Sequence, residues 1–248
     1  MWLIPDTMGN VEIRTDDANK PEKKYVLELV HLNKLIPHEM VIRSAVDDFK
    51  IQVVDVGYLM RPILVDKNSN LILDGHHRQK GLAELGYTEA PVIMIDYLDG
   101  SEITLDTWYP LLNYELLEVI EKLREIGILI EESTLSEIDL MQKLSSRDFT
   151  AIIGNHDTKY IIADDRESLF ETLKDNWLVN IQYYDTMVGC FEGSSPTLTA
   201  VVSWSYTKQE VLENVRNGMI HLPKTTRHNL KYRYADCNFP LHKLGKSD

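Results

Sequence analysis

Cysteine is scarce in this chain: the 248 residues include only Cys190 and Cys237. The two lie far apart in the sequence, so they form no short metal-ligand spacing. They also cannot build the framework of several disulfides that stabilises small secreted proteins. We therefore expect two reduced thiols with a structural role.

Long apolar runs are missing as well. A membrane-spanning helix needs about 20 consecutive apolar residues, and no run in the sequence approaches that length. The opening stretch MWLIPDTMGNVEIRTDD lacks the basic start and the long apolar segment of a signal peptide. These two absences predict a cytoplasmic protein without a membrane partner.

Positive charge is in short supply. Lysine and arginine number 26 against 39 aspartate and glutamate residues, which gives a formal net charge of -13. Such a surface disfavours general attraction to DNA, RNA or anionic lipid, so we expect no nucleic-acid partner. A local basic pocket is still compatible with the composition. The GxxxxGK[ST] pattern of P-loop enzymes is also absent.

Strand and helix patterns alternate over the first hundred residues. A polar lead-in at 10–24, expected to be mobile, precedes the β-rich stretch YVLELVHLNKL. The runs RPILVD and LILDG flank KNSN, which is typical of a β-hairpin. A helix should follow as far as Leu85, with Gly86 as its stop, and APVIMIDYL should be a buried strand. Another helix is predicted where apolar residues recur at steps of three and four: Ile42, Val46, Phe49, Val53 and Val56. The alternation indicates α/β architecture.

A second set of elements begins after TWYP. NYELLEVIEKLREIG predicts an amphipathic helix that ends at glycine, and FTAIIGNHDTKYIIADD predicts a hairpin. SLFETLKDNWLV, LTAVVSWSY and TKQEVLENVRNG predict a helix, a strand and a capped helix. We place a boundary near Pro110, which divides the chain into domains at 1–110 and 111–248. Because no flexible linker marks this boundary, we expect the two domains to pack together. A cleft between two domains is the default ligand site.

The stretch LDGHHRQKGLAELG, at 73–86, places two histidines and an arginine where a strand gives way to a helix. Adjacent histidines on a helix point about 100° apart, so His76 and His77 do not form a zinc-chelating pair. Gly75 permits close backbone approach, the next amides open a helix, and Arg78 supplies a forked cation. These are the parts of a phosphate cradle. In the alternative, purely structural interpretation, Asp74 caps the helix and the histidines are merely exposed.

This arrangement resembles the nucleotide-binding motif of the ParB and sulfiredoxin superfamily, in which the turn holds nucleotide phosphates. More closely, the chain resembles the free L-serine kinases of archaea and of some bacterial siderophore clusters, which make O-phospho-L-serine from serine. Five stretches match in the family's order, whereas Glu132 to Tyr206 matches only loosely. The matching stretches are PHE at 37–39, RPILV at 61–65, LDGHHRQKGLAELG at 73–86, TWYP at 107–110 and PKTTRH at 223–228.

The resemblance implies a ParB/sulfiredoxin-like nucleotide-binding domain packed against a second α/β domain, and a kinase that acts on the hydroxyl of free L-serine. ATP or ADP would be the phosphoryl donor, and the product would feed cysteine or related biosynthesis. Glu39 would orient or deprotonate the hydroxyl, although a glutamate near a helix start also has a macrodipole explanation. Asp74 would hold Mg²⁺ directly or through water.

The other positions that match the family's motifs are implied to bind the two substrates. The resemblance implies that nucleotide phosphates contact Gly75, His76, His77 and Arg78. It implies that serine contacts Thr107, Trp108, Lys224, Thr226 and His228. Without the family, PKTTRHNL would be an ordinary basic loop, and Trp108 beside a proline would be a hydrophobic anchor between domains.

Two other function classes follow from the same superfamily. A sulfiredoxin-like redox enzyme needs a cysteine between the glycine and the histidine of the motif, where this chain has His76. A ParB-like DNA-binding protein needs a basic helix-turn-helix, which the sequence lacks. The alternative to the kinase is a ParB-like nucleotide-dependent regulatory or DNA-binding module without kinase activity, although the net charge and the missing basic helix argue against DNA binding. The choice between ATP and ADP and the oligomeric state are open at this point.

Overall fold

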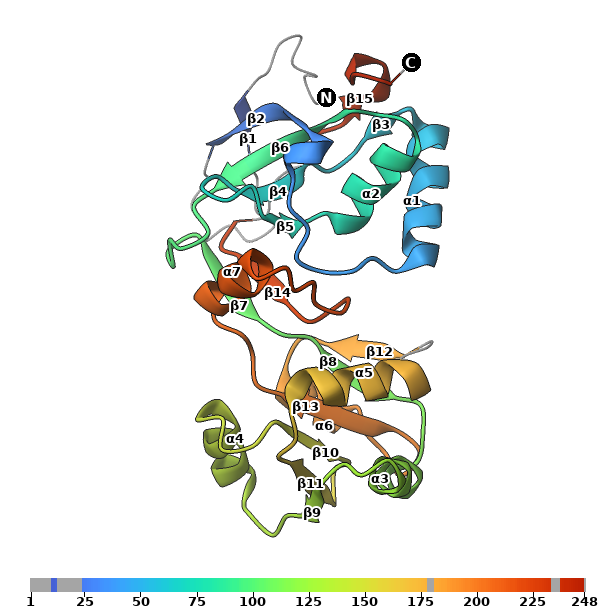
Figure 1. Ribbon diagram of the computed structural model, residues 1–248, viewed down its shortest axis with the longest axis vertical. Coiled ribbons are helices and arrows are strands. Elements are labelled where there is room, and N and C mark those ends of the chain that lie inside the picture. The colour runs from blue at the N-terminus through green and yellow to red at the C-terminus, as the bar shows by residue number, and fades with distance from the viewer. Residues whose placement is uncertain (1–9, 13–23, 178–180, 233–236, 248) are drawn as a thin grey trace. The chain divides into compact units, whose positions relative to one another are not determined.

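The computed structural model describes residues 10–12, 24–177, 181–232 and 237–247 (Figure 1). The chain divides into two compact units. Unit 1 comprises Met1–Leu105, Thr207–Pro223 and His228–Asp248, and unit 2 comprises Asp106–Tyr206 and Lys224–Arg227. The first boundary lies close to the predicted Pro110. The prediction of a continuous second domain at 111–248 differs from this division, because the C-terminal Leu241 and Leu244 are buried in the core of unit 1.

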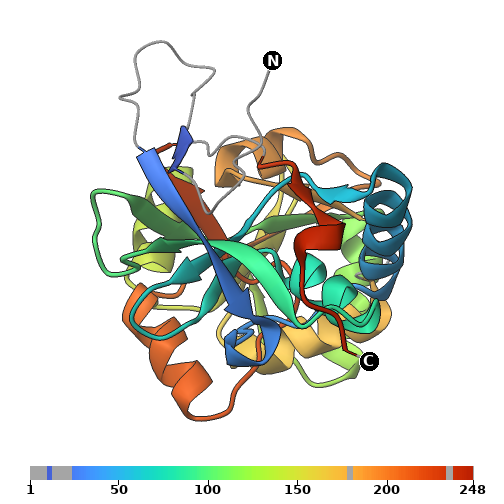
Figure 2. The same cartoon turned by 90° about the horizontal axis from the view of Figure 1, so that it is seen from above.

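Unit 1 contains a five-stranded sheet, in which only the pair β4–β6 is parallel (Figure 2). The strand order is β1 (Asn10–Glu12), β2 (Lys24–His31), β6 (Glu89–Ile95), β4 (Ile63–Asp66) and β5 (Ile72–Asp74). The predicted first strand is shorter than its pattern, because a 3-10 turn, η1 (Leu32–Lys34), follows it. The hairpin on KNSN is confirmed as β4–β5. The predicted mobile lead-in differs in that β1 pairs with β2, while 13–23 lies outside the described residues.

Two helices complete the core of unit 1. They are α1 (Arg43–Val56) and α2 (His76–Glu84), which lie side by side in Figure 1. In α1, Val46 and Val53 are buried and Phe49 packs against the core, but Ile42 and Val56 are exposed. The apolar period therefore predicts the helix and its buried centre, whereas the end positions face solvent.

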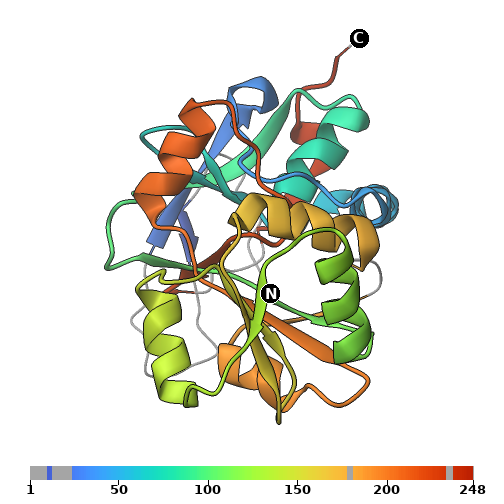
Figure 3. The same ribbon diagram turned by 60° about the horizontal axis from the view of Figure 1, so that its bottom comes forward.

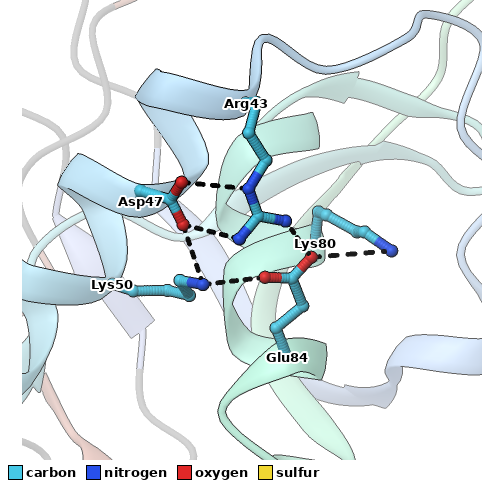
Figure 4. A network of polar contacts seen from close by, with 5 residues as sticks. All are labelled: Arg43, Asp47, Lys50, Lys80 and Glu84. Atoms are coloured by element: carbon cyan, nitrogen blue, oxygen red, sulfur yellow. Dashed lines mark hydrogen bonds and ion pairs between the residues drawn. The ribbon is translucent and has the colours of Figure 1, made fainter.

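An ion-pair network joins the exposed sides of α1 and α2 (Figure 4). Arg43 Nη2 lies 2.6 Å from Asp47 Oδ1, and its Nη1 lies 2.8 Å from Glu84 Oε1. Lys50 Nζ bridges the same two carboxylates at 2.9 and 2.8 Å. Hydrogen bonds from Arg43 and Lys50 hold the pKa of Asp47 at about 2. Solvent screens such exposed pairs, so the network orients the two helices more than it stabilises them.

Short elements finish unit 1. The pair β3 (Tyr58–Leu59) and β15 (Phe239–Pro240) is antiparallel, and η2 (Leu241–Lys243) follows β15. Strands β7 (Ile103–Asp106) and β14 (Arg227–Leu230) form a second pair. The capped helix predicted after 207 is confirmed as α7 (Lys208–Arg216), because Thr207 and Glu210 form a capping box.

Unit 2 is built on a six-stranded antiparallel sheet (Figure 3). The strand order is β12 (Gln182–Tyr184), β8 (Tyr109–Leu112), β13 (Thr199–Ser203), β10 (Ala151–Gly154), β11 (Lys159–Ile162) and β9 (Ile130–Glu132). The predicted hairpin is β10–β11. Pro110 lies inside β8 rather than at a domain boundary, opposite Tyr183.

Helices cover both faces of this sheet. α4 (Glu137–Ser145) and α6 (Met187–Glu192) pack on the face that carries Ile152 and Val202. The alternate residues Ile153 and Val201 point to the opposite face and are also fully buried. Apolar rows on α3 (Leu116–Glu125) and α5 (Arg166–Asn176) are buried as well. None of the helices in the described part of the chain has both the length and the apolar character of a membrane span.

The two cysteines occupy one unit each. Cys190 is buried in the core of unit 2, and Cys237 is buried in unit 1 beside the Leu59 carbonyl. Burial raises the pKa of the Cys190 thiol to about 12, so this thiol stays protonated at neutral pH. A protonated, enclosed thiol is a poor nucleophile, in agreement with the structural role expected from the sequence.

Candidate functional site

The turn before α2 has a backbone that only glycine adopts easily. Gly75 is the N-cap residue of α2 and has φ +109°. A Cβ atom there would lie 3.0 Å from Nε and Nη2 of Arg78, so a side chain would push the guanidinium away. The first hydrogen bond of the helical ladder runs from Gln79 N–H to Gly75 O. The amides of residues 76–78 therefore precede the ladder and open the helix N-terminus, where anions bind.

Asp74 does not cap α2. The cap position belongs to Gly75, and no side chain makes a capping hydrogen bond there. Instead, Asp74 Oδ2 accepts a hydrogen bond of 2.6 Å from Arg78 Nη2. The carboxylate is half-exposed, whereas the guanidinium is largely covered. The capping interpretation is thus wrong, and the pair instead places one anionic and one cationic group beside the turn.

The two histidines of the motif have different surroundings. His77 Nε2 accepts a hydrogen bond of 3.0 Å from the backbone N–H of Ile42, the N-cap residue of α1. Its side chain therefore ties the start of α1 to α2. His76 is buried, and its Nε2 accepts from the backbone N–H of His38 at 3.3 Å. Burial lowers the pKa of His76 to about 3, so the ring is neutral. Neither ring is merely exposed, as the structural alternative required.

Backbone hydrogen bonds of the two flanking residues, His38 and Met40, hold Glu39 in position. His38 O accepts from His221 N–H, and Met40 N–H donates to His221 O, both at 2.8 Å. This parallel bridge fixes Glu39 opposite His221. The Glu39 side chain is only 12% exposed, and α1 begins at Arg43 with no acidic residue in its first turn. The helix-start explanation for Glu39 is therefore not supported.

Histidine rings gather around His38, the residue before Glu39. His38 is fully buried, and the ring of His76 meets it edge-on with centroids 4.6 Å apart. The ring of His228 does the same at 5.3 Å, and its Nε2 lies 3.0 Å from the Tyr97 hydroxyl. Burial lowers the pKa of His38 and of His228 well below the usual value. These rings are neutral. Among the described residues, no three His, Cys, Asp or Glu side chains are arranged to hold a metal ion.

A second group of predicted residues lies in unit 2. Lys224 Nζ lies 4.7 Å from the centre of the Trp108 ring, and the Arg227 guanidinium lies 5.2 Å from it. The buried Thr107 hydroxyl donates to Thr225 O at 2.9 Å, which joins TWYP to PKTTRH across 118 positions of sequence. Thr226 is buried in the same segment. The arrangement combines two cations with one indole ring.

The predicted residues thus form two sets. The structure gathers Glu39, Asp74, Gly75, His76, His77, Arg78 and His228 in unit 1, and Thr107, Trp108, Lys224 and Thr226 in unit 2. His228 differs from its predicted grouping with Lys224, because it packs against His38 and Tyr97. Sequence reasoning missed four neighbours of these sets: His38, Tyr97, His221 and Arg227. His38 and Arg227 stand inside the motifs PHE and PKTTRH, whereas no local signal marks Tyr97 or His221.

Comparisons with known proteins agree with this fold. No protein-family model matches the chain. An ATP-dependent L-serine kinase of Staphylothermus marinus is 29% identical over 248 residues, which cover 95% of this chain and 98% of that protein. An ADP-dependent L-serine kinase of Thermococcus kodakarensis is 27% identical over 235 residues, which cover 90% of this chain and 95% of that protein.

A ParB-like protein of Sulfolobus acidocaldarius is 44% identical over 84 residues, which cover 34% of this chain and 41% of that protein. The solved structure of a free serine kinase in complex with AMP matches with a TM-score of 0.75 and 26% identity. That match covers 91% of this chain and 96% of the other. The mixed α/β, ParB-like architecture and the family resemblance predicted from the sequence are confirmed.

The strained turn gives a first prediction. Gly75→Ala should weaken nucleotide binding and destabilise the fold by about 1–3 kcal/mol, because alanine is strained at a positive φ and its Cβ would displace Arg78. Gly57→Ala is the matched control: Gly57 also has a positive φ, of +77°, but nothing lies within 4 Å of its Cβ position. Thermal unfolding and calorimetric titration with ADP measure both effects. Equal loss of nucleotide affinity in the two variants would contradict the role of the turn.

The buried histidines give a second prediction. An unfolded histidine titrates near pH 6.5, whereas the folded-state pKa values of His38 and His76 lie below it. The stability that these neutral histidines contribute is therefore fully present above pH 6.5, and it is lost as the pH falls below that value. The free energy of unfolding should drop by about 1.4 kcal/mol per pH unit for each buried histidine. Urea unfolding at several pH values tests this: His38→Gln should flatten the slope, and exposed His156→Gln should leave it unchanged.

Proposed function

We propose that this chain, a relative of the free L-serine kinases, transfers a phosphoryl group from an adenine nucleotide to the hydroxyl of free L-serine. The observation that supports this proposal most directly is the match over 91% of the chain to a free serine kinase in complex with AMP. Relatives named for L-serine kinase activity match at nearly full length. The reaction breaks the bond between the terminal phosphorus and its bridging oxygen, and forms a bond between that phosphorus and serine Oγ.

Glu39 acts as the general base. A serine hydroxyl is a weak nucleophile until a group accepts its proton. The backbone bridge to His221 fixes the position of Glu39, and the low exposure of its side chain limits competition from water. The carboxylate takes the proton from Oγ as the phosphoryl group arrives. The leaving nucleotide keeps the electron pair of the broken bond.

The start of α2 holds the donor phosphates. Backbone amides of 76–78 and the Arg78 guanidinium supply hydrogen bonds and positive potential. Since His76 and His77 use Nε2 to accept backbone hydrogen bonds, they contribute through their amides and through the orientation of the helix. ATP and ADP differ only in the length of the phosphate chain, and relatives of both kinds exist.

Mg²⁺ fits this turn in the manner usual for phosphoryl transfer. It binds through one or two carboxylates plus nucleotide phosphates and water, rather than in a cage of protein ligands. The half-exposed carboxylate of Asp74 would supply such a ligand, and its partner Arg78 lies on the same turn. The ion would neutralise charge on the phosphates when bound.

Serine binds through the indole and the cations of unit 2. Lys224 offers a charge for the carboxylate of the amino acid, and Trp108 offers an apolar wall that Lys224 and Arg227 keep in place. The buried Thr107 hydroxyl fixes the PKTTRH segment by donating to Thr225 O. Thr226 and His228 are the remaining residues that we propose to contact serine. We further propose that the enzyme works in the cytoplasm without a nucleic-acid partner.

Mass spectrometry tests the reaction directly. The purified chain is incubated with L-serine, Mg²⁺ and either ATP or ADP, and O-phospho-L-serine is measured. Product from one donor alone identifies the nucleotide. Nucleotide binding without product from either donor would overturn the kinase and favour the ParB-like regulatory module.

Glu39→Gln should lower kcat by about 10²–10⁴-fold, because glutamine keeps the shape and loses the base. Serine and nucleotide binding should persist. Glu118→Gln, an exposed glutamate in the first turn of α3, is the control for a helix-start effect and should keep full turnover. Measuring kcat together with thermal stability separates the roles: a Glu39→Gln enzyme that melts lower yet turns over normally would refute the assignment.

Lys224→Met should raise the KM for serine about tenfold or more, because a charge-assisted hydrogen bond to a carboxylate is worth about 1.5–3 kcal/mol. The KM for the nucleotide should stay the same, since the lost contact belongs to one substrate. Exposed Lys122→Met on α3 serves as the control for general loss of charge. Steady-state kinetics with each substrate varied in turn decides the matter. A parallel rise of both KM values would mean that this segment does not select serine.

A further inference from the structure

The serine residues proposed in unit 2 match only one of the two charges of the substrate. Near neutral pH a free amino acid carries a carboxylate and an α-ammonium group. A site that selects it among other small alcohols therefore needs both a cation and an anion. The proposed residues of unit 2 supply the cation but no acidic side chain; they are Thr107, Trp108, Lys224 and Thr226.

An acidic residue, Asp185, lies beside Trp108. Strand β12 pairs with β8 in antiparallel register, with Tyr184 opposite Tyr109. Asp185 is the residue after Tyr184. Trp108 is the residue before Tyr109, so the same register, continued by one position, brings Asp185 level with Trp108.

Arg227 connects Asp185 to the indole ring. Its Nη2 donates to Asp185 Oδ2 at 2.9 Å, and its Nη1 donates to the carbonyl oxygen of Asp185 at 3.3 Å. The guanidinium carbon lies 5.2 Å from the centre of the Trp108 ring. Lys224 Nζ lies 4.7 Å from the same centre. The four side chains therefore form one group of two cations and one anion around an aromatic ring.

The carboxylate of Asp185 has room for a second cation. An ionised carboxylate accepts about four hydrogen bonds, and Arg227 takes one of them at Oδ2. The side chain of Asp185 is 55% exposed, whereas that of Arg227 is 25% exposed. Solvent screens an ion pair with this exposure, so its contribution to folding is small. The pair is thus open to a ligand, and its removal should leave the fold intact.

We infer that Asp185 binds the α-ammonium group of serine and that Arg227 positions the Asp185 carboxylate for this contact. The inference rests on the proposed kinase function and adds a specificity-determining residue to it. Lys224 takes the carboxylate of serine and Asp185 takes the ammonium group. Positive and negative charges then alternate from Lys224 through the substrate to Asp185 and Arg227. This arrangement favours a free amino acid over an alcohol that lacks the ammonium group.

Asp185→Asn tests the contact, because asparagine keeps the shape and loses the charge. The KM for serine should rise about tenfold, as expected for the loss of a hydrogen bond between charged groups. The kcat and the nucleotide KM should stay the same, and Asp185→Glu should restore part of the affinity. Asp148→Asn is the matched control, since Asp148 is 50% exposed and pairs with Lys143 at 3.5 Å.

Arg227→Met separates binding by Asp185 from a merely structural pair. It removes the guanidinium but leaves the carboxylate, so the serine KM should rise less than in Asp185→Asn. An unchanged serine KM in Asp185→Asn would overturn the inference. So would an equal rise in Arg227→Met with no further rise in the double variant, because Asp185 would then act only by holding Arg227.

Calorimetric titration in the presence of AMP tests the contact without catalysis. L-serine is compared with 3-hydroxypropionate, which keeps the carboxylate and the hydroxyl but lacks the ammonium group. The preference for L-serine should fall about tenfold in Asp185→Asn. An unchanged preference would refute the inference even if phosphoserine forms. A reduced preference in a protein that makes no phosphoserine would refute the kinase proposal and leave the amino-acid site intact.

Discussion

The segment Ile36–Met40 has little regular secondary structure, yet the position of the proposed base, Glu39, depends on how this segment is fixed. Its backbone is hydrogen-bonded to two separate parts of unit 1. Ile36 N–H donates to Asn70 O and Ile36 O accepts from Ile72 N–H, and two further bonds join the segment to His221. The His38 ring adds a bond to the Ile72 carbonyl. Each bond is of modest net worth. Together they restrict the conformation of the loop. A general base on a loop is effective only when the loop is held in a fixed position.

The position of the phosphate turn follows from the packing of α1 against α2. Gly81 stands in the middle of α2, where glycine costs about 1 kcal/mol relative to alanine. A Cβ at this position would lie 2.4 Å from the Phe49 ring, so the glycine permits the close approach of α1. His77 then joins the start of α1 to the same helix. The exposed ion pairs of Arg43, Lys50 and Glu84 act along an interface that apolar contact has already set.

Local patterns predicted the elements that local forces determine. The strand and helix around Gly75, the hairpin on KNSN and the capping box at Thr207 were all readable from residue type and spacing, because turn geometry and capping act over a few residues. Strand β8 was not readable, since Pro110 argues against a strand except where its missing N–H faces no partner. The assignment of 207–223 and 228–248 to unit 1 could also not be predicted from the sequence. It depends on tertiary packing, such as the burial of Leu241 and Leu244 in the core of unit 1.

The same limit applies to the candidate site. Motifs pointed to Glu39 and the phosphate turn. Two of their neighbours, His221, which bonds to the backbone on either side of Glu39, and Tyr97, which contacts His228, come from distant segments with no signal of their own. Asp74 shows the opposite failure. An aspartate before a helix has the local appearance of a cap, and only the positive φ of Gly75 and the contact with Arg78 reveal that it makes a different interaction.

The electrostatics of unit 1 follow from the burial of its histidines. The chain has a net charge of -13, so binding of the proposed nucleotide requires local positive potential, which imidazolium ions could supply. The rings of His38, His76 and His228 are instead too deeply enclosed to be protonated near neutral pH. In the proposed mechanism, positive potential comes from the amides of α2 and from Arg78, neither of which titrates near neutrality. The proposed nucleotide binding therefore does not depend on the protonation of these three histidines.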